Sequence, residues 1–189
     1  MTKKNTYTPM MTQYLELKEK HKDEIIFYRL GDFYEMFFDD AKIASQELDL
    51  VLTGKNAGVE ERVPMCGIPH HAANGYIQRL IQKGYKVAIV EQMENPATAK
   101  GLVKRDILKI VTPGTIMDEV NDEKATVYIA SLHDYQFGLA VVLCEMTTGE
   151  MRAQLIDKQV MAIQKVLLGN NVAEIVIEEK FDKKIVKMI

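Results

Sequence analysis

The segment Gly31-Asp-Phe-Tyr-Glu-Met-Phe-Phe38 combines four aromatic side chains with two carboxylates, Asp32 and Glu35. If the backbone is extended here, Phe33, Glu35 and Phe37 project from one face and Tyr34 from the other. On a helix, Phe33 and Glu35 would instead point about 200° apart. An extended backbone therefore sets a flat apolar ring beside a carboxylate. Because a buried, unpaired carboxylate is costly, this pair is either exposed or functional. From composition alone, core packing of the aromatic rings is an equally good interpretation.

The other side chains with reactive chemistry give weaker signals. His70 and His71 are adjacent, so they diverge in regular structure, and neither has a partner at metal-ligand spacing. Cys66 has no neighbour in sequence that would activate its thiol. The phosphate-binding pattern Gly-x-x-x-x-Gly-Lys-Ser/Thr does not occur. We therefore expect no catalytic residue, no metal site, no cofactor and no enzyme activity in these residues.

The elements that position these side chains follow from hydrophobic periodicity and turn signals. Thr8-Pro9 begins a helix, and the β-branched and aromatic run from Ile25 to Gly31 predicts a strand. A second helix opens at Asp39-Asp40. Further along we predict a hairpin-end loop over 54–64, a helix over 73–83, a strand over 86–91, a basic loop over 95–106 and a strand over 107–111.

The character of the chain changes after residue 116. The acidic segment 117–124 lacks periodicity and is predicted to be a linker. Three strand-like runs, over 126–132, 137–145 and 150–156, precede a helix over 157–168 and a strand over 174–178. This β-β-β-α-β pattern is short for an independent core, so we expect a truncated second domain.

Composition places the chain among soluble globular proteins. Its 189 residues are 47% hydrophobic and 27% charged, and no apolar run is long enough to span a membrane. With two cysteines, it is no disulfide scaffold, which suits a reducing, cytoplasmic compartment. The net charge is −3; residues 1–116 hold 16 Lys/Arg against 15 Asp/Glu, and residues 117–189 hold 8 against 12. An anionic partner is therefore expected to meet the first part.

Several motifs in order resemble the N-terminus of the bacterial MutS family of DNA mismatch-recognition proteins. They are Thr8-Pro-Met-Met-x-Gln-Tyr14, Phe27-Tyr-Arg-x-Gly-Asp-Phe-Tyr-Glu-x-Phe37, Pro64-Met-x-Gly-Ile-Pro69, Glu91-Gln92, Asn95-Pro-Ala-Thr98 and Val111-Thr-Pro-Gly-Thr115. The resemblance implies a mixed α/β chain with three parts. Residues 1–116 form a mismatch-recognition domain, a mixed sheet flanked by helices. Residues 117–124 are a linker, and 125–189 are the start of a connector domain with an RNase H-like fold.

The resemblance also implies the binding residues. Phe33 and Glu35 match the family's Phe-x-Glu motif, in which the phenylalanine enters the minor groove and stacks on a mispaired base while the DNA is kinked. Glu35 would hydrogen-bond that base. We expect Glu35 to repel the phosphates of intact duplex and, at a mismatch, to accept a proton, because nearby phosphates favour the neutral acid. The predicted phosphate contacts are Lys55, Lys100, Lys104 and Arg105.

For the longer protein, the resemblance implies a homodimer that embraces DNA containing mispaired or unpaired bases. It implies that ATP and Mg²⁺ act elsewhere in that protein, which becomes a sliding clamp and recruits MutL, with a nucleoid-associated location in the cytoplasm and no membrane partner. Two alternatives stay open for residues 125–189. One is an interaction or allosteric module without chemistry. The other, an RNase H-like nuclease, needs a cluster of inward carboxylates for two metal ions, whereas Glu145 is alone on its predicted strand.

Overall fold

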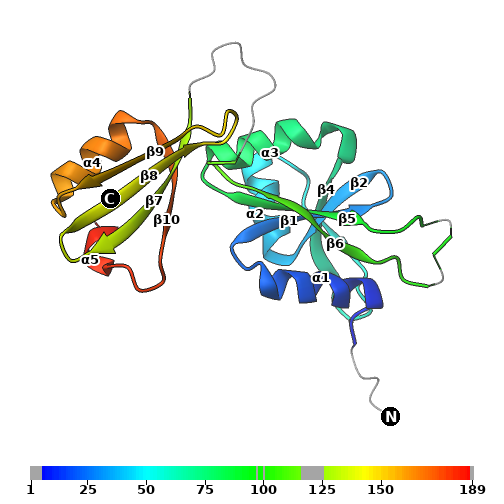
Figure 1. Ribbon diagram of the computed structural model, residues 1–189. Helices are drawn as coiled ribbons and strands as arrows, with labels where there is room; N and C mark the ends of the chain where they lie inside the picture. Colours follow the sequence, from blue (N-terminus) through cyan, green and yellow to red (C-terminus); the bar gives the residue numbers. More distant parts are fainter. Residues whose placement is uncertain (1–5, 97, 100, 116–125, 188–189) are drawn as a thin grey trace. The chain divides into compact units, whose positions relative to one another are not determined.

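The computed structural model describes residues 6–96, 98–99, 101–115 and 126–187 (Figure 1). Two compact units divide the chain: unit 1, Met1–Thr112, and unit 2, Pro113–Ile189. Each unit contains one mixed sheet and helices, which confirms the predicted mixed α/β class. The predicted linker 117–124, and the predicted boundaries at residues 116 and 125, lie outside the described residues.

Unit 1 is built on a six-stranded sheet with the strand order β3-β4-β2-β1-β5-β6. Strands β1 and β5 run parallel, and all other neighbouring strands run antiparallel. The elements are α1 (Pro9–Lys20), β1 (Glu24–Leu30), β2 (Phe33–Phe37), α2 (Phe38–Leu48), β3 (Thr53–Lys55), β4 (Val63–Pro69), the 3₁₀ turn His70–Ala72, α3 (Ala73–Gln82), β5 (Lys86–Gln92) and β6 (Arg105–Val111).

Helix α1 covers the sheet face that carries Phe37. Its start is as predicted, since the Thr8 hydroxyl accepts a hydrogen bond from the Met11 amide at 3.4 Å and Pro9 is the first helical residue. Met11 and Tyr14 are buried in the core formed with β1, β2 and β5. The ring of Tyr14 meets the ring of Phe37 edge-on at 5.0 Å between centroids. This packing fixes the end of β2.

Helices α2 and α3 lie against the opposite face of the sheet (Figure 1). The Cys66 thiol of β4 donates a hydrogen bond to the carbonyl of Ala41 in α2 at 3.4 Å. Ile77, Leu80 and Ile81 form the buried side of α3. With a helix layer on each face, the middle of the sheet is enclosed, and the functional side chains have to lie at its margins.

Two predicted loops are shorter than expected. The loop predicted over 54–64 does form the end of a hairpin, between β3 and β4, but it is shorter at both ends, because Gly54 and Lys55 pair with Pro64 and Val63. The basic loop predicted over 95–106 ends earlier, because β6 begins at Arg105, which pairs with Gln92. In both cases the strand is defined by its partner more than by its own sequence.

Unit 2 contains a four-stranded sheet with the strand order β10-β7-β8-β9, in which β7 and β10 run parallel and the other pairs antiparallel. The elements are β7 (Tyr128–Tyr135), β8 (Gly138–Glu145), β9 (Met151–Ile156), α4 (Val160–Gly169), β10 (Val172–Ile177) and α5 (Lys183–Val186). The predicted order of three strands, a helix and a strand is confirmed. Ile163 and Leu167 of α4 pack into the core of this sheet.

No helix among the described residues is long and apolar enough to cross a membrane.

Candidate nucleic-acid interface

Strand β2 presents Phe33 and Glu35 on one face, as the period-2 interpretation predicted. Tyr34 and Met36 are buried on the other face, and Phe37 is buried under α1. Phe33, at the first position of the strand, is 48% exposed. The aromatic segment is therefore both core and surface: its inner rings hold the strand, and its first ring reaches solvent.

The turn that precedes Phe33 is fixed by hydrogen bonds. Gly31 has φ +56°, a left-handed conformation that glycine adopts without strain. Nε of Arg29 donates to the Gly31 carbonyl at 2.6 Å, and the His70 amide donates to the Asp32 carbonyl at 2.9 Å. Nδ1 of His70 lies 3.1 Å from that same carbonyl oxygen. Phe33 is therefore held by a rigid turn, and His70 is a structural residue.

A second group of side chains supports the same turn from the opposite face. The Tyr34 hydroxyl donates to the Glu91 carboxylate, which lies 3.6 Å from Nη1 of Arg29. The Arg29 guanidinium lies 5.7 Å from the centre of the Tyr34 ring. Burial, and next the hydrogen bond to Glu91, raise the pKa of Tyr34 to about 12. Tyr34 therefore stays a neutral donor at any ordinary pH, and its ring packs on the buried face of β2.

Glu35 is paired with Lys55. The Lys55 ammonium and the Glu35 carboxylate form an ion pair and hydrogen bond. Nζ of Lys55 also lies 5.5 Å from the centre of the Phe37 ring. The sequence predicts Lys55 as a phosphate contact and does not predict its pairing with Glu35. The two residues are 20 positions apart, and the strand order β3-β4-β2 brings them together.

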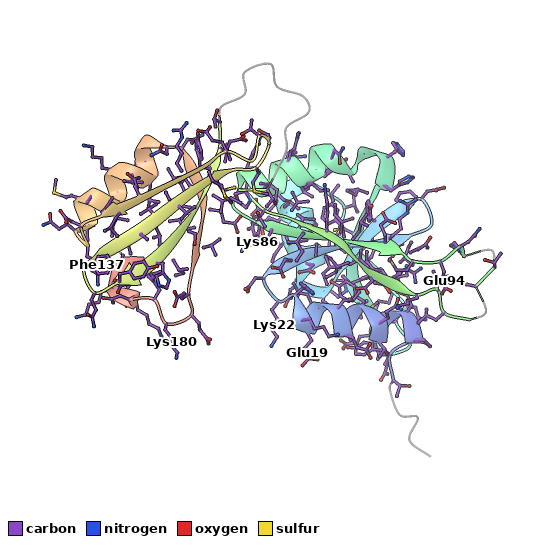
Figure 2. The ribbon with its side chains drawn as sticks, in the orientation of Figure 1. Glu19, Lys22, Lys86, Glu94, Phe137 and Lys180 are labelled. Atoms are coloured by element: carbon purple, nitrogen blue, oxygen red, sulfur yellow. The ribbon has the colours of Figure 1, made fainter. Side chains whose placement is uncertain are left out.

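The remaining predicted phosphate contacts differ in their exposure. Lys104 is exposed, and its backbone amide donates to the Glu94 carboxylate at 2.7 Å; Figure 2 labels Glu94 in the segment between β5 and β6. Arg105 is only 7% exposed, and its guanidinium donates to the carbonyls of Arg29 at 2.8 Å and Val103 at 3.0 Å. A phosphate contact by Arg105 stays a prediction and would require it to leave these partners. Lys100 lies outside the described residues.

The strand register places the first residue of β2 and the first residue of β6 at the same end of the sheet. Phe33 pairs with Leu30 at the end of β1, and Arg105 pairs with Gln92 at the end of the parallel strand β5. Three strand spacings separate β2 from β6, about 14 Å. Phe33 and Lys104, which directly precedes β6, therefore both lie at this end of the sheet, and both are exposed.

The other side chains considered for chemistry have structural positions. Burial, and next the charge of Asp40, raise the pKa of the Cys66 thiol to about 12. The Glu145 carboxylate accepts hydrogen bonds from the amides and hydroxyls of Thr147 and Thr148. Among the described residues, no group of three or more His, Cys, Asp or Glu side chains could hold a metal ion.

Comparison with known proteins gives the family. The family model MutS domain I matches residues 8–120. Similar curated proteins, each named DNA mismatch repair protein MutS, come from Clostridium tetani, 51% identical over 96% of this chain, and Acetivibrio thermocellus, 59% identical over 76%. The chain belongs to the MutS family. It covers 21% and 17% of those two relatives, so it spans about a fifth of their length.

The match to MutS domain I includes every element of unit 1 from α1 to β6. A relative from Bacillus velezensis, also named DNA mismatch repair protein MutS, is 46% identical over 94% of the chain. The similarity to MutS proteins therefore continues through unit 2.

Proposed function

We propose that this chain is the N-terminal part of a DNA mismatch repair protein and that unit 1 binds mispaired or unpaired bases, with Phe33 inserted into the minor groove. The observation that carries the proposal is the exposure of Phe33. It is 48% exposed on a strand whose other aromatic rings, Tyr34 and Phe37, are buried, and the turn before it is fixed. A single exposed ring on a rigid support suits insertion between bases.

The energetics of insertion explain how one ring could find many kinds of mismatch. Separating a base step costs a few kcal/mol of stacking, and it costs less where pairing is already poor. Stacking of the ring on a base returns about 1–3 kcal/mol. Matched and mismatched duplexes then differ in how easily they deform, and recognition needs no base-specific hydrogen bond. Replacement of Phe33 by alanine should therefore abolish the preference for a mismatch.

Glu35 is proposed to discriminate against intact duplex. A carboxylate near DNA repels phosphates, and at a mismatch Glu35 would accept a proton and donate a hydrogen bond to the displaced base. Glu35→Gln keeps a donor but removes the charge. We expect this variant to bind matched duplex more tightly than the wild type in fluorescence anisotropy. Unchanged affinity for matched duplex would contradict the repulsion.

Lys55, Lys100, Lys104 and Arg105 remain the proposed phosphate contacts, and Lys104 is the most accessible of those that the structure describes. Lys104→Ala should weaken binding to all sequences alike and reduce the slope of log affinity against log salt by about one. An unchanged slope would show that Lys104 makes no phosphate contact.

Unit 2 is proposed to be the start of an RNase H-like connector domain that couples unit 1 to the rest of the protein without chemistry of its own. The hydrogen bonds that Glu145 receives from Thr147 and Thr148 give its carboxylate a structural task, which favours this role over a nuclease. A nuclease would be shown by Mg²⁺-dependent cleavage of DNA by the purified chain.

For the full-length protein we propose a homodimer that closes on DNA, becomes a sliding clamp with ATP and recruits MutL, in the bacterial cytoplasm at the nucleoid. These 189 residues lack the Gly-x-x-x-x-Gly-Lys-Ser/Thr pattern, so they do not fit a P-loop nucleotide site. The proposed role of unit 1 therefore involves no step that uses ATP or Mg²⁺.

A further inference from the structure

The ion pair between Lys55 and Glu35 connects two strands that are not neighbours. Glu35 is on β2, Lys55 is on β3, and β4 lies between them. Both side chains are mostly enclosed: 18% of Glu35 and 29% of Lys55 are exposed. The pair is therefore shielded from water more than an ordinary surface ion pair, and its partners are coupled more strongly.

Gly67 is the residue of β4 directly opposite Glu35. A Cβ atom at Gly67 would lie 3.5 Å from Cγ of Glu35, an ordinary contact distance, so the Glu35 side chain passes close to the β4 backbone at this position. From the other side, the Lys55 side chain passes the ring of Phe37, whose centre is 5.5 Å from the ammonium.

This arrangement conflicts with the task proposed for Glu35. To donate a hydrogen bond to a base stacked on Phe33, the Glu35 carboxyl group has to reach that base, whereas here it is bound by the Lys55 ammonium. The carboxylate is also bound by a residue of β3, on the far side of β4 from its own strand. Lys55 must therefore move away before Glu35 can meet a base, and a DNA phosphate is the anion that can compete for its ammonium.

We propose that Lys55 is a specificity-determining residue of this site. In the DNA-free protein and on matched duplex it holds the Glu35 carboxylate toward β3, and at a mismatch it releases Glu35 when a phosphate takes over its ammonium. This inference rests on the proposed function of Phe33 and Glu35. It goes beyond a phosphate contact, because it makes the effect of Lys55 depend on which residue occupies position 35.

Lys55→Met removes the ammonium and keeps an apolar stem beside Phe37. Glu35 then carries an uncompensated charge that repels the phosphates of matched duplex. At a mismatch Glu35 engages the base as a neutral acid, so the repulsion is relieved there. The ratio of mismatched to matched affinity should therefore rise by about two- to five-fold in this variant. Loss of a plain phosphate contact would lower both affinities by one factor and leave the ratio unchanged.

The test is a double-mutant cycle in the full-length protein, with the wild type, Lys55→Met, Glu35→Gln and the double variant. Fluorescence anisotropy compares a G·T duplex with its matched partner at one salt concentration. We expect Lys55→Met to raise the affinity ratio when residue 35 is Glu and to leave it unchanged when residue 35 is Gln. Lys104→Met is the matched control, which should leave the ratio unchanged in both backgrounds.

An unchanged ratio for Lys55→Met in both backgrounds would overturn the proposal and leave Lys55 as a phosphate contact. Thermal unfolding shows whether each variant is folded. If Lys55→Met does not fold, Lys55→Gln takes its place in the cycle. Phe33→Ala, measured in the same assay, distinguishes a failure of the proposed function from a failure of the role of Lys55. If it keeps the mismatch preference, the proposed function itself fails. If Phe33→Ala loses that preference while Lys55→Met leaves the ratio of mismatched to matched affinity unchanged, only the role of Lys55 is refuted.

Discussion

Removal of the Tyr14 hydroxyl should destabilise unit 1 by about 2 kcal/mol. This hydroxyl is buried and donates to Oδ2 of Asp40 at 2.9 Å. Asp40 is itself 3% exposed and also accepts from the Ile26 amide at 3.1 Å, and its Oδ1 lies 2.8 Å from Nζ of Lys18. These contacts join α1, β1 and α2 at the end of β2, so they hold the strand that carries Phe33.

The magnitude follows from the nature of the bond. A hydrogen bond to a charged group contributes about 1.5–3 kcal/mol, more than a neutral one. Tyr14→Phe keeps the edge-on ring contacts, at 5.0 Å to Phe37 and 5.6 Å to Tyr28, so almost no packing is lost. Burial, and next the charge of Asp40, raise the pKa of Tyr14, so the hydroxyl stays a donor throughout the accessible pH range.

Amide hydrogen exchange at Ile26 measures this loss within unit 1. A change of about 2 kcal/mol corresponds to about 30-fold faster exchange. Tyr85→Phe is the matched control: its hydroxyl donates to Glu47 at 3.2 Å and is only partly buried, so we expect a change of about 0.5 kcal/mol or less. Exchange at Ile26 within about twofold of the wild type in Tyr14→Phe would refute the role given to the Asp40 contacts.

Two further predictions concern groups with shifted pKa values. Hydrogen bonds from Thr147, and next from Thr148, lower the pKa of Glu145 from 4.5 to about 2. The unfolded chain therefore binds the proton first, and unit 2 should lose stability as the pH falls from about 4.5 toward 2. In urea unfolding, Glu145→Gln should weaken this pH dependence, whereas Glu179→Gln, at an exposed position, should leave it unchanged; equal curves for Glu145→Gln and the wild type would contradict the assignment. The Cys66 thiol, buried and with its pKa raised to about 12, should react with iodoacetamide at pH 8 far more slowly than the partly exposed Cys144. The folded chain is labelled and the extent of labelling is measured by mass spectrometry. Equal labelling of both cysteines would contradict the burial of Cys66.

Local patterns in the sequence were sufficient for most of the framework. The cap at Thr8 and the alternation of Phe33, Glu35 and Phe37 depend on near neighbours, so both could be predicted. Strand β3 was missed because Gly54 and Lys55 have little strand propensity and pair only through β4.

Long-range contacts of charged groups could not be predicted in the same way. The hydrogen bond from Tyr14 to Asp40 spans 26 residues, and the pair of Lys55 with Glu35 spans 20. The sequence predicts Arg105 within a basic loop, but β6 begins at this residue, and its guanidinium donates a hydrogen bond to the Arg29 carbonyl. Basic residues that look alike in sequence thus differ in whether they are already paired within the protein. This difference depends on the strand order, which the sequence did not predict.

The most direct test of the account is the mismatch preference of Phe33→Ala in the full-length protein. Phe137→Ala is the matched control, since Phe137 is a more exposed phenylalanine, 76% exposed, that lies in unit 2 and is labelled in Figure 2. Anisotropy compares a G·T duplex with its matched partner at one salt concentration. We expect Phe33→Ala to lose most of the mismatch preference and to keep its matched-duplex affinity, while Phe137→Ala retains both. A preference that survives in Phe33→Ala would show that this ring does not read the mismatch.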